Sequence, residues 1–255
     1  MPLDIVTVPC LSDNYAFLIR DTATGVVALV DAPEAGPIEA ALKTRGWDLD
    51  MILLTHHHPD HVDGVAGLKA AFAPKIYGGK ADAHRLPPLD VALAEGENVA
   101  VGESVARVLD VSGHTLGHLA FHFADAKAAF TADSLMALGC GRVFEGTFAQ
   151  MWASLAQFLD MDPETVICSG HEYTAANARF AITIEPKNTA LKARIAQIDA
   201  ARAKGEPTVP SLLGTELATN PFLRANCDAV KAALGLDGAD DAAVFAEIRR
   251  RKDSF

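Results

Sequence analysis

Apolar runs alternate with short polar turns through the N-terminal part of the chain, and their spacing predicts strands interleaved with helices. Runs rich in β-branched and aromatic residues predict strands at residues 4–9, 15–21, 26–32, 51–55, 75–79, 103–113, 118–125, 127–133 and 165–170. Apolar residues three and four positions apart predict helices at residues 37–46, 62–73 and 148–159. Recurring strands and helices of this kind are typical of an α/β body.

The pattern changes near residue 173, because strand signals are absent beyond it and helical periodicity dominates. Helices are expected at residues 173–184, 188–205, 229–236 and 241–252. The sequence therefore predicts two domains, an α/β domain over residues 1–172 and an all-helical domain over residues 173–255.

Composition narrows the class of protein. Half of the 255 residues are hydrophobic and 22% are charged, which favours a packed core over disorder. The net charge of −11 argues against nucleic acid or an anionic membrane as a partner. The N-terminus lacks the pattern of a secretory signal, and no apolar run reaches the roughly 20 residues of a membrane span. Four cysteines without a CxxC pair favour reduced, buried thiols in a cytoplasmic protein: Cys10, Cys140, Cys168 and Cys227.

Four histidines and two aspartates crowd into the segment THHHPDHVDG, directly after the apolar run ILL. His56 and His58 are two positions apart at a predicted strand end, where alternate side chains share one face, and His57 should point away. Asp60 and His61 fall at the entry to the next helix. Imidazole and carboxylate groups in this alternation predict a metal site that suits zinc, iron or manganese.

Three more candidate ligands stand at the ends of later predicted strands, namely His114, Asp133 and His171. Strand ends are where α/β sheets present functional groups, although a lone histidine there is more often a hydrogen-bonded turn residue. Together the five histidines and two aspartates are enough for two adjacent ions with one bridging carboxylate and an open position. A closed structural or storage site would have four ligands per ion, often cysteines, so the set favours catalysis.

The order of these ligands resembles that of the metallo-β-lactamase fold hydrolases. The resemblance implies an α/β fold, the αββα sandwich, followed here by a C-terminal all-helical domain. It implies two divalent metal ions, with zinc preferred over iron or manganese. One ion would be held by His56, His58 and His114, and the other by Asp60, His61 and His171. Asp133 would bridge the two ions. It also implies that Asp31 orients a ligand histidine, with a turn cap as the alternative.

Further segments resemble the hydroxyacylglutathione hydrolase (glyoxalase II) family, in that family's order: VPCLSDNYAFLI, TADSLMALGCGRVFEGT, SGHEYT, TNPFLR and IRRRKDSF. The resemblance runs to the last residue. It implies hydrolysis of S-(2-hydroxyacyl)glutathione, mainly S-D-lactoylglutathione, to glutathione and D-lactate, the last step of methylglyoxal detoxification. A hydroxide shared by two ions would attack the thioester, with Asp60 and Asp133 as the catalytic carboxylates.

The same resemblance implies a set of substrate-binding residues. Arg249 and Lys252 match the pair that holds the glycine carboxylate of glutathione, although a basic helix end is also a favourable solvated terminus. Tyr173 matches another glutathione contact. Arg142 and Phe144 stand where the family commonly has lysine and tyrosine, so the charge is kept but a hydroxyl is lost. A weaker hold on glutathione, or a slightly different thiol carrier, is the hypothesis that follows.

Other activities of the same fold remain as alternatives. The runner-up is a glutathione persulfide dioxygenase with one iron, against which the basic helical tail speaks, and another thioesterase of this fold is also open. A β-lactamase is disfavoured because no export signal and no cysteine ligand are found. The expected partner is a small glutathione thioester, with no nucleic acid and no membrane, and the chain is expected to be a monomer.

Overall fold

The computed structural model describes residues 3–255 and divides into two compact units. The first unit contains the chain up to Val111 together with Leu116–Ala132. The second unit contains Ser112–Thr115 together with Asp133–Phe255. The domain boundary expected after residue 172 stays a prediction.

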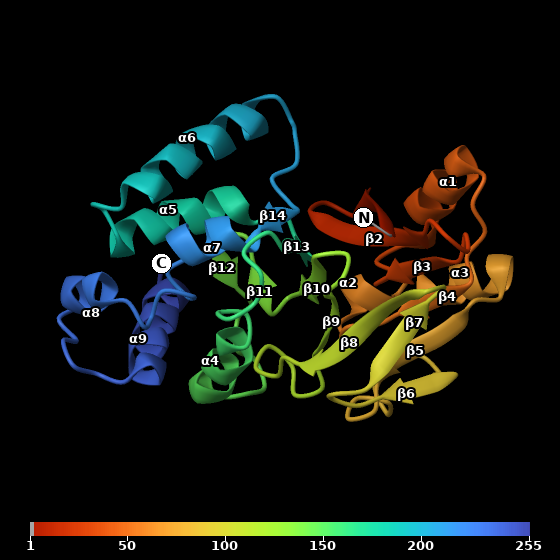
Figure 1. Cartoon of the computed structure of the whole chain (residues 1–255), viewed down its shortest axis with the longest axis horizontal. Helices are drawn as coiled ribbons and strands as arrows, with labels where there is room; N and C mark the ends of the chain where they lie inside the picture. The colour runs from red at the N-terminus through yellow and green to blue at the C-terminus, as the bar shows by residue number, and fades with distance from the viewer. Residues whose placement is uncertain (1–2) are drawn as a thin grey trace. The chain divides into compact units, whose positions relative to one another are not determined.

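The first unit contains a mixed six-stranded sheet in which the strands follow one another in chain order (Figure 1). The first three strands pair antiparallel, and the third to the sixth pair parallel. The strands are β1 (Leu3–Cys10), β2 (Asn14–Asp21), β3 (Val27–Val30), β4 (Met51–Leu53), β5 (Lys75–Gly79) and β6 (Val91–Leu93). Parallel neighbours need crossover connections. Helix α1 (Ala35–Arg45) connects β3 to β4, helices α2 (Pro59–Val62) and α3 (Val65–Phe72) connect β4 to β5, and a loop connects β5 to β6.

Four antiparallel strands complete the first unit, namely β7 (Asn98–Val101), β8 (Ser104–Asp110), β9 (Leu119–Phe123) and β10 (Ala128–Ala132). Strand β8 alternates, with Ala106 buried and Val105 exposed, because one face packs inward and the other meets solvent. Phe130 of β10 packs edge-on against Phe17 of the six-stranded sheet at 5.7 Å between ring centroids. The two sheets thus share an aromatic contact in the core.

The second unit is mostly helical, as the periodicity of its sequence predicts. Its elements are β11 (Leu135–Met136), β12 (Gly139–Cys140), α4 (Phe148–Ala156), β13 (Val166–Ser169), α5 (Thr174–Ile184), α6 (Thr189–Ala203), β14 (Ser211–Leu212), α7 (Leu213–Thr219), α8 (Asp228–Leu234) and α9 (Asp241–Asp253). Figure 1 shows α5 and α6 side by side, and the two helices contact each other. Phe180, Phe222 and Phe245 form the aromatic centre of this unit.

Two expectations from the sequence need correction. The helix expected at residues 62–73 begins later, because α2 ends at Val62 and α3 extends from Val65 to Phe72 with Gly64 as its N-cap. A Cβ there would lie 2.8 Å from the Glu34 carbonyl carbon, so only glycine allows this approach to the loop after β3. A strand does occur beyond residue 173, since Ser211 and Leu212 pair with Val166 and Ile167.

The cysteines behave as their spacing predicts. All four are free thiols, and three of them are buried. Burial raises the pKa of the Cys140 thiol to about 11, so this thiol stays protonated at neutral pH. Among the helices of residues 3–255, none is long and apolar enough to cross a membrane.

Candidate metal centre

The first unit carries the histidine cluster on an extended segment between β4 and α2. Strand β4 ends at Leu53, so His56 and His58 lie beyond the strand rather than within its end as expected. His58 is the extended N-cap residue of α2. The Nε2 atom of His56 lies 3.2 Å from Nδ1 of His58, with the rings nearly perpendicular. Two imidazole nitrogens therefore converge, as ligands of one cation would.

Asp31 fixes the orientation of His61. It follows β3 in a left-handed conformation, with φ of 57°, and is buried. Its carboxylate accepts hydrogen bonds from the Thr55 amide, from the Thr55 hydroxyl and from His61 Nδ1, all at 2.8 Å. Because Nδ1 donates to a carboxylate, Nε2 of His61 carries the lone pair that a metal needs. This Nε2 lies 3.8 Å from Asp60 Oδ2.

Asp60 is itself held by Asn14, a residue that the sequence analysis missed. The Asn14 amide donates to Asp60 Oδ2 at 3.1 Å and to the Asp60 carbonyl at 3.0 Å. Asn14 is buried at the start of β2, within the segment VPCLSDNYAFLI. The two residues are 46 positions apart, and no local pattern signals such a pairing. The contact positions the exposed end of the candidate ligand Asp60.

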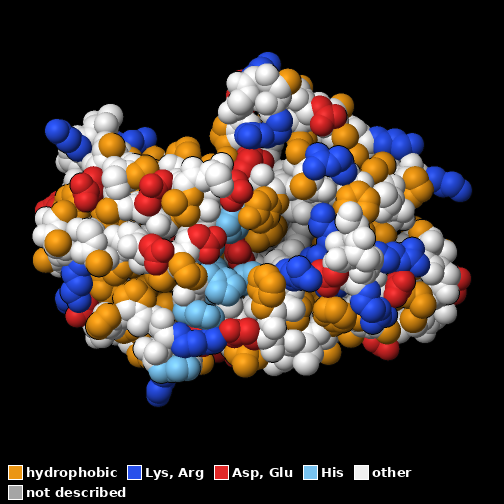
Figure 2. All heavy atoms as spheres, turned by 180° about the vertical axis from the view of Figure 1, so that it is seen from behind, with side chains coloured by type: hydrophobic (Ala, Val, Ile, Leu, Met, Phe, Trp, Pro, Cys, Tyr) orange, Lys and Arg blue, Asp and Glu red, His pale blue; other side chains and the backbone are white. Residues whose placement is uncertain are grey.

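Two further histidines of the first unit, His118 and His57, lie near His56 and His58. The ring of His118 stacks on His56 at 4.5 Å between centroids. His57 points away, as the alternation predicts, and its Nδ1 lies 3.1 Å from Asp82 Oδ2. Asp82 also accepts a hydrogen bond from Arg85 at 2.5 Å. On the face shown in Figure 2, histidine side chains reach the surface among carboxylates and basic groups.

The second unit brings together the other three candidate ligands. Oδ2 of Asp133 lies 3.5 Å from Nε2 of His114 and 3.3 Å from Nε2 of His171. All three residues are buried. A carboxylate oxygen placed between two imidazole nitrogens is the arrangement that a bridging ligand requires.

A glycine makes this arrangement possible. A Cβ at Gly141 would lie 1.8 Å from the Asp133 carbonyl oxygen and 3.1 Å from His114 Nδ1, so no larger residue fits there. The neighbouring Arg142 carbonyl accepts a hydrogen bond from His114 Nδ1 at 2.7 Å. As for His61, a protonated Nδ1 places the lone pair that a metal needs on Nε2 of His114. The residues of both units therefore fit divalent metal ions by donor type and by ring orientation.

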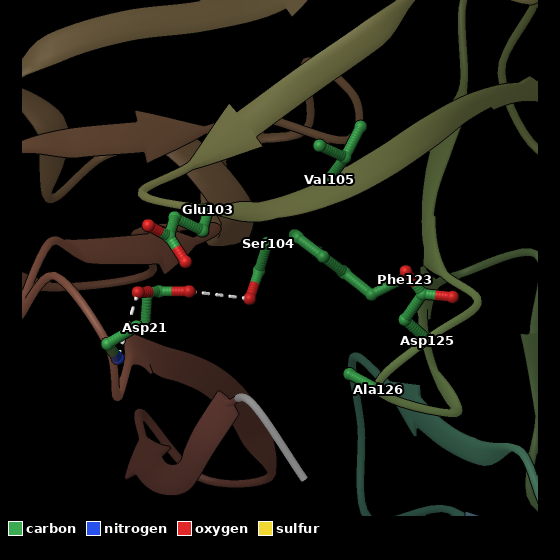
Figure 3. Close-up of a pocket in the computed structure, with 8 residues that line it drawn as sticks. Asp21, Glu103, Ser104, Val105, Phe123, Asp125 and Ala126 are labelled. Carbon is green, nitrogen blue, oxygen red and sulfur yellow. Dashed lines mark hydrogen bonds between the residues drawn. The ribbon is translucent and has the colours of Figure 1, made fainter.

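One acidic pocket of the first unit lacks the imidazole donors of the candidate metal centre. A pocket of about 180 Å³ in the first unit is lined by Asp21, Glu103 and Asp125, and no histidine lines it (Figure 3). Asp21 points to Ser104 and accepts its hydroxyl at 2.7 Å. This hydrogen bond is the main cause that lowers the pKa of Asp21 to about 2. The carboxylate is satisfied by the protein itself.

The predicted substrate-binding residues all belong to the second unit. Tyr173 stacks on His171 with the rings 4.6 Å apart and nearly parallel, and it is 39% exposed. Phe144 is 62% exposed and lies 5.3 Å from the His114 ring. The Arg142 guanidinium lies over Phe144 at 5.7 Å. Two exposed aromatic rings therefore lie beside the candidate ligands His114 and His171.

Arg249 and Lys252 share helix α9 but are less accessible than their basic sequence suggests. Arg249 is 5% exposed. Lys252 lies over the rings of Phe180 and Phe255. Burial, followed by repulsion from neighbouring arginines, lowers the pKa of Lys252. These two residues are cations set into aromatic surroundings rather than a solvated helix end.

Comparison with known proteins agrees with this picture. The family model described as metallo-beta-lactamase superfamily matches residues 12–171, and that described as hydroxyacylglutathione hydrolase C-terminus matches residues 172–255. A hydroxyacylglutathione hydrolase of Ruegeria pomeroyi is 62% identical over 255 residues, covering all of both chains. The crystal structure of ETHE1 from Myxococcus xanthus is 23% identical with a TM-score of 0.68, covering 98% of this chain and 90% of that one.

A third comparison concerns the metal. The protein TTHA1623, whose crystal structure is of a di-iron-bound form, is 28% identical with a TM-score of 0.61. The match covers 86% of this chain and all of that one. Fold, ligand set and family models together define a metallo-β-lactamase superfamily protein with a C-terminal helical domain. Within that superfamily, the chain belongs to the hydroxyacylglutathione hydrolase family, which confirms the resemblance inferred from its motifs.

Proposed function

We propose that the chain hydrolyses the thioester of S-(2-hydroxyacyl)glutathione, with S-D-lactoylglutathione as its main substrate, and so completes methylglyoxal detoxification. The observation that carries the proposal is the end-to-end match to the Ruegeria pomeroyi hydrolase. The match includes the helical segment 172–255, which bears three of the five predicted glutathione contacts: Tyr173, Arg249 and Lys252. Glutathione and free thiols belong together in a reducing compartment, which supports the cytoplasm as the location.

The proposed metal ligands form two groups. His56, His58 and His114 would hold one ion, Asp60, His61 and His171 would hold the other, and Asp133 would bridge them. Support comes from the imidazole and carboxylate donors, from the Nδ1 hydrogen bonds of His61 and His114, and from the di-iron form of the similar protein TTHA1623. Divalent ions in such a centre acidify water and polarise a carbonyl, which is the chemistry that acyl transfer needs. Zinc is the proposed metal, with iron and manganese also suited to these donors.

The protein groups around the ligands have separate tasks. Asp31 and the Arg142 carbonyl keep Nδ1 of His61 and His114 protonated, so that Nε2 faces the cation. Asn14 keeps the carboxylate of Asp60 in place. The departing group is a thiolate, and since its thiol has a pKa near 8.5, no protein acid has to protonate it.

Thiol release from S-D-lactoylglutathione by the purified, metal-loaded chain tests the proposal. The expected result is turnover that disappears with a chelator and returns with zinc. Absence of turnover with zinc, iron and manganese in turn contradicts the proposed activity. Oxygen uptake with glutathione persulfide, in place of thiol release, would assign the chain to the dioxygenases instead.

A further inference from the structure

The guanidinium of Arg249 is already bound to a carboxylate of its own chain. Its Nε and Nη2 atoms donate to Asp253 Oδ1 at 3.0 and 2.8 Å, one turn further along α9. A planar guanidinium grips a carboxylate through this edge. The glycine carboxylate of glutathione, which Arg249 is predicted to bind, would need the same edge.

The same oxygen of Asp253 also faces Arg142. Nε of Arg142 lies 3.8 Å from Asp253 Oδ1, so a single carboxylate oxygen lies between two guanidinium groups. The Arg142 side chain is 62% exposed and that of Asp253 is 26% exposed. Solvent therefore reaches the Asp253 carboxylate and the Arg142 guanidinium.

Arg249 does not depend on Asp253 to stay in place. Its Nη1 donates to the Cys140 carbonyl at 3.2 Å, and its guanidinium lies 5.2 Å from the centre of the Phe222 ring. Both contacts are buried, and neither involves the edge that Asp253 occupies. Removal of the Asp253 charge should therefore uncover a fixed guanidinium rather than release a mobile one.

We propose that Asp253 is an internal ligand of the Arg142–Arg249 pair, which a carboxylate of the substrate displaces, and that Asp253 thereby sets substrate affinity. The inference rests on the proposed function, because that function supplies the glutathione carboxylate. A molecule without this carboxylate leaves Asp253 in place. The effect of Asp253 is therefore confined to ligands that carry the displacing group.

The test compares Asp253→Asn with Glu247→Gln in the zinc-loaded protein at low ionic strength. Glu247 lies on the same helix and pairs with Arg250 and Arg251 at 3.1 and 2.9 Å, so its substitution removes the same charge from a different pair of arginines. Calorimetry measures binding of S-methylglutathione and of its glycine-amide derivative. Asp253→Ser repeats the measurement with a smaller side chain.

We expect Asp253→Asn to tighten binding of S-methylglutathione about two- to fivefold, the size of a partly exposed ion pair. Binding of the amide derivative should not change, and Glu247→Gln should change neither. With S-D-lactoylglutathione, KM should fall while kcat stays constant.

Unchanged or weaker binding of S-methylglutathione by both Asp253 variants overturns the inference, and weaker binding would mean that Asp253 supports Arg249 instead. If Asp253→Asn tightens binding of S-methylglutathione as expected but the wild type does not hydrolyse lactoylglutathione, only the proposed function is overturned. No binding of S-methylglutathione to any variant overturns both.

Discussion

Asp31→Asn tests whether Asp31 orients the candidate ligand His61. The substitution keeps the size of the side chain and turns one hydrogen-bond acceptor into a donor. Asp31 accepts three hydrogen bonds, two from Thr55 and one from His61 Nδ1. If the new amide group faces His61, Nδ1 has to accept, and the ring proton moves to Nε2, which then cannot bind a cation. If the amide is reversed, its NH₂ group meets the N–H of Thr55 instead.

The first orientation removes the metal-binding lone pair from Nε2 of His61, and the second leaves a buried donor facing the Thr55 amide. An unsatisfied buried donor lowers the free energy of unfolding by about 1–3 kcal/mol. Loss of the partner that orients a ligand histidine lowers metal affinity about 10- to 100-fold. The backbone should not change, since a φ of 57° suits asparagine as well as aspartate.

Zinc affinity is measured by competition with a chromophoric chelator, and stability by urea unfolding of the metal-free protein. Asp21→Asn is the matched control, because Asp21 is equally buried and hydrogen-bonded in the same unit but lies in the pocket without histidines. Both variants should lose stability, and only Asp31→Asn should lose zinc affinity. Wild-type zinc affinity in Asp31→Asn would refute the orienting role of Asp31.

Three further predictions use other parts of the structure. Asp133→Asn should lower kcat at least about 100-fold with an unchanged circular dichroism spectrum, because the proposed bridge loses charge; activity near that of the wild type would exclude bridging. Phe144→Tyr should lower KM for lactoylglutathione, since the exposed ring gains a hydroxyl, and an unchanged KM would contradict a role for that hydroxyl. The carboxyl of Asp21 has a folded pKa of about 2 against an ordinary 3.8. Its stabilising contribution is therefore complete above about pH 4 and is lost as the pH falls toward 2. Urea midpoints of the wild type and Asp21→Asn should converge over that range, and a constant difference down to pH 2 would contradict the lowered pKa.

Short elements of secondary structure show where sequence patterns are insufficient to predict the fold. The long helices α5, α6 and α9 are predicted from spacing alone, because each has buried residues three or four positions apart along one face. Strand β14 has two residues and exists only because it pairs with β13. Gly64, in the turn between α2 and α3, lies against the loop after β3. No local sequence pattern signals this contact.

The sequence by itself determined the types of the candidate ligands, their order and the family. HxHxDH and the later strand-end residues are chemically unusual in apolar surroundings, and local spacing is enough to recognise them. Only the tertiary structure decided which side chains contact the candidate ligands and the predicted substrate-binding arginines. Asn14 donates a hydrogen bond to Asp60, and Asp253 pairs with Arg249 and lies close to Arg142. Contacts between polar groups far apart in the chain depend on how strands and helices pack, and a hydrogen bond leaves no periodic trace in the sequence.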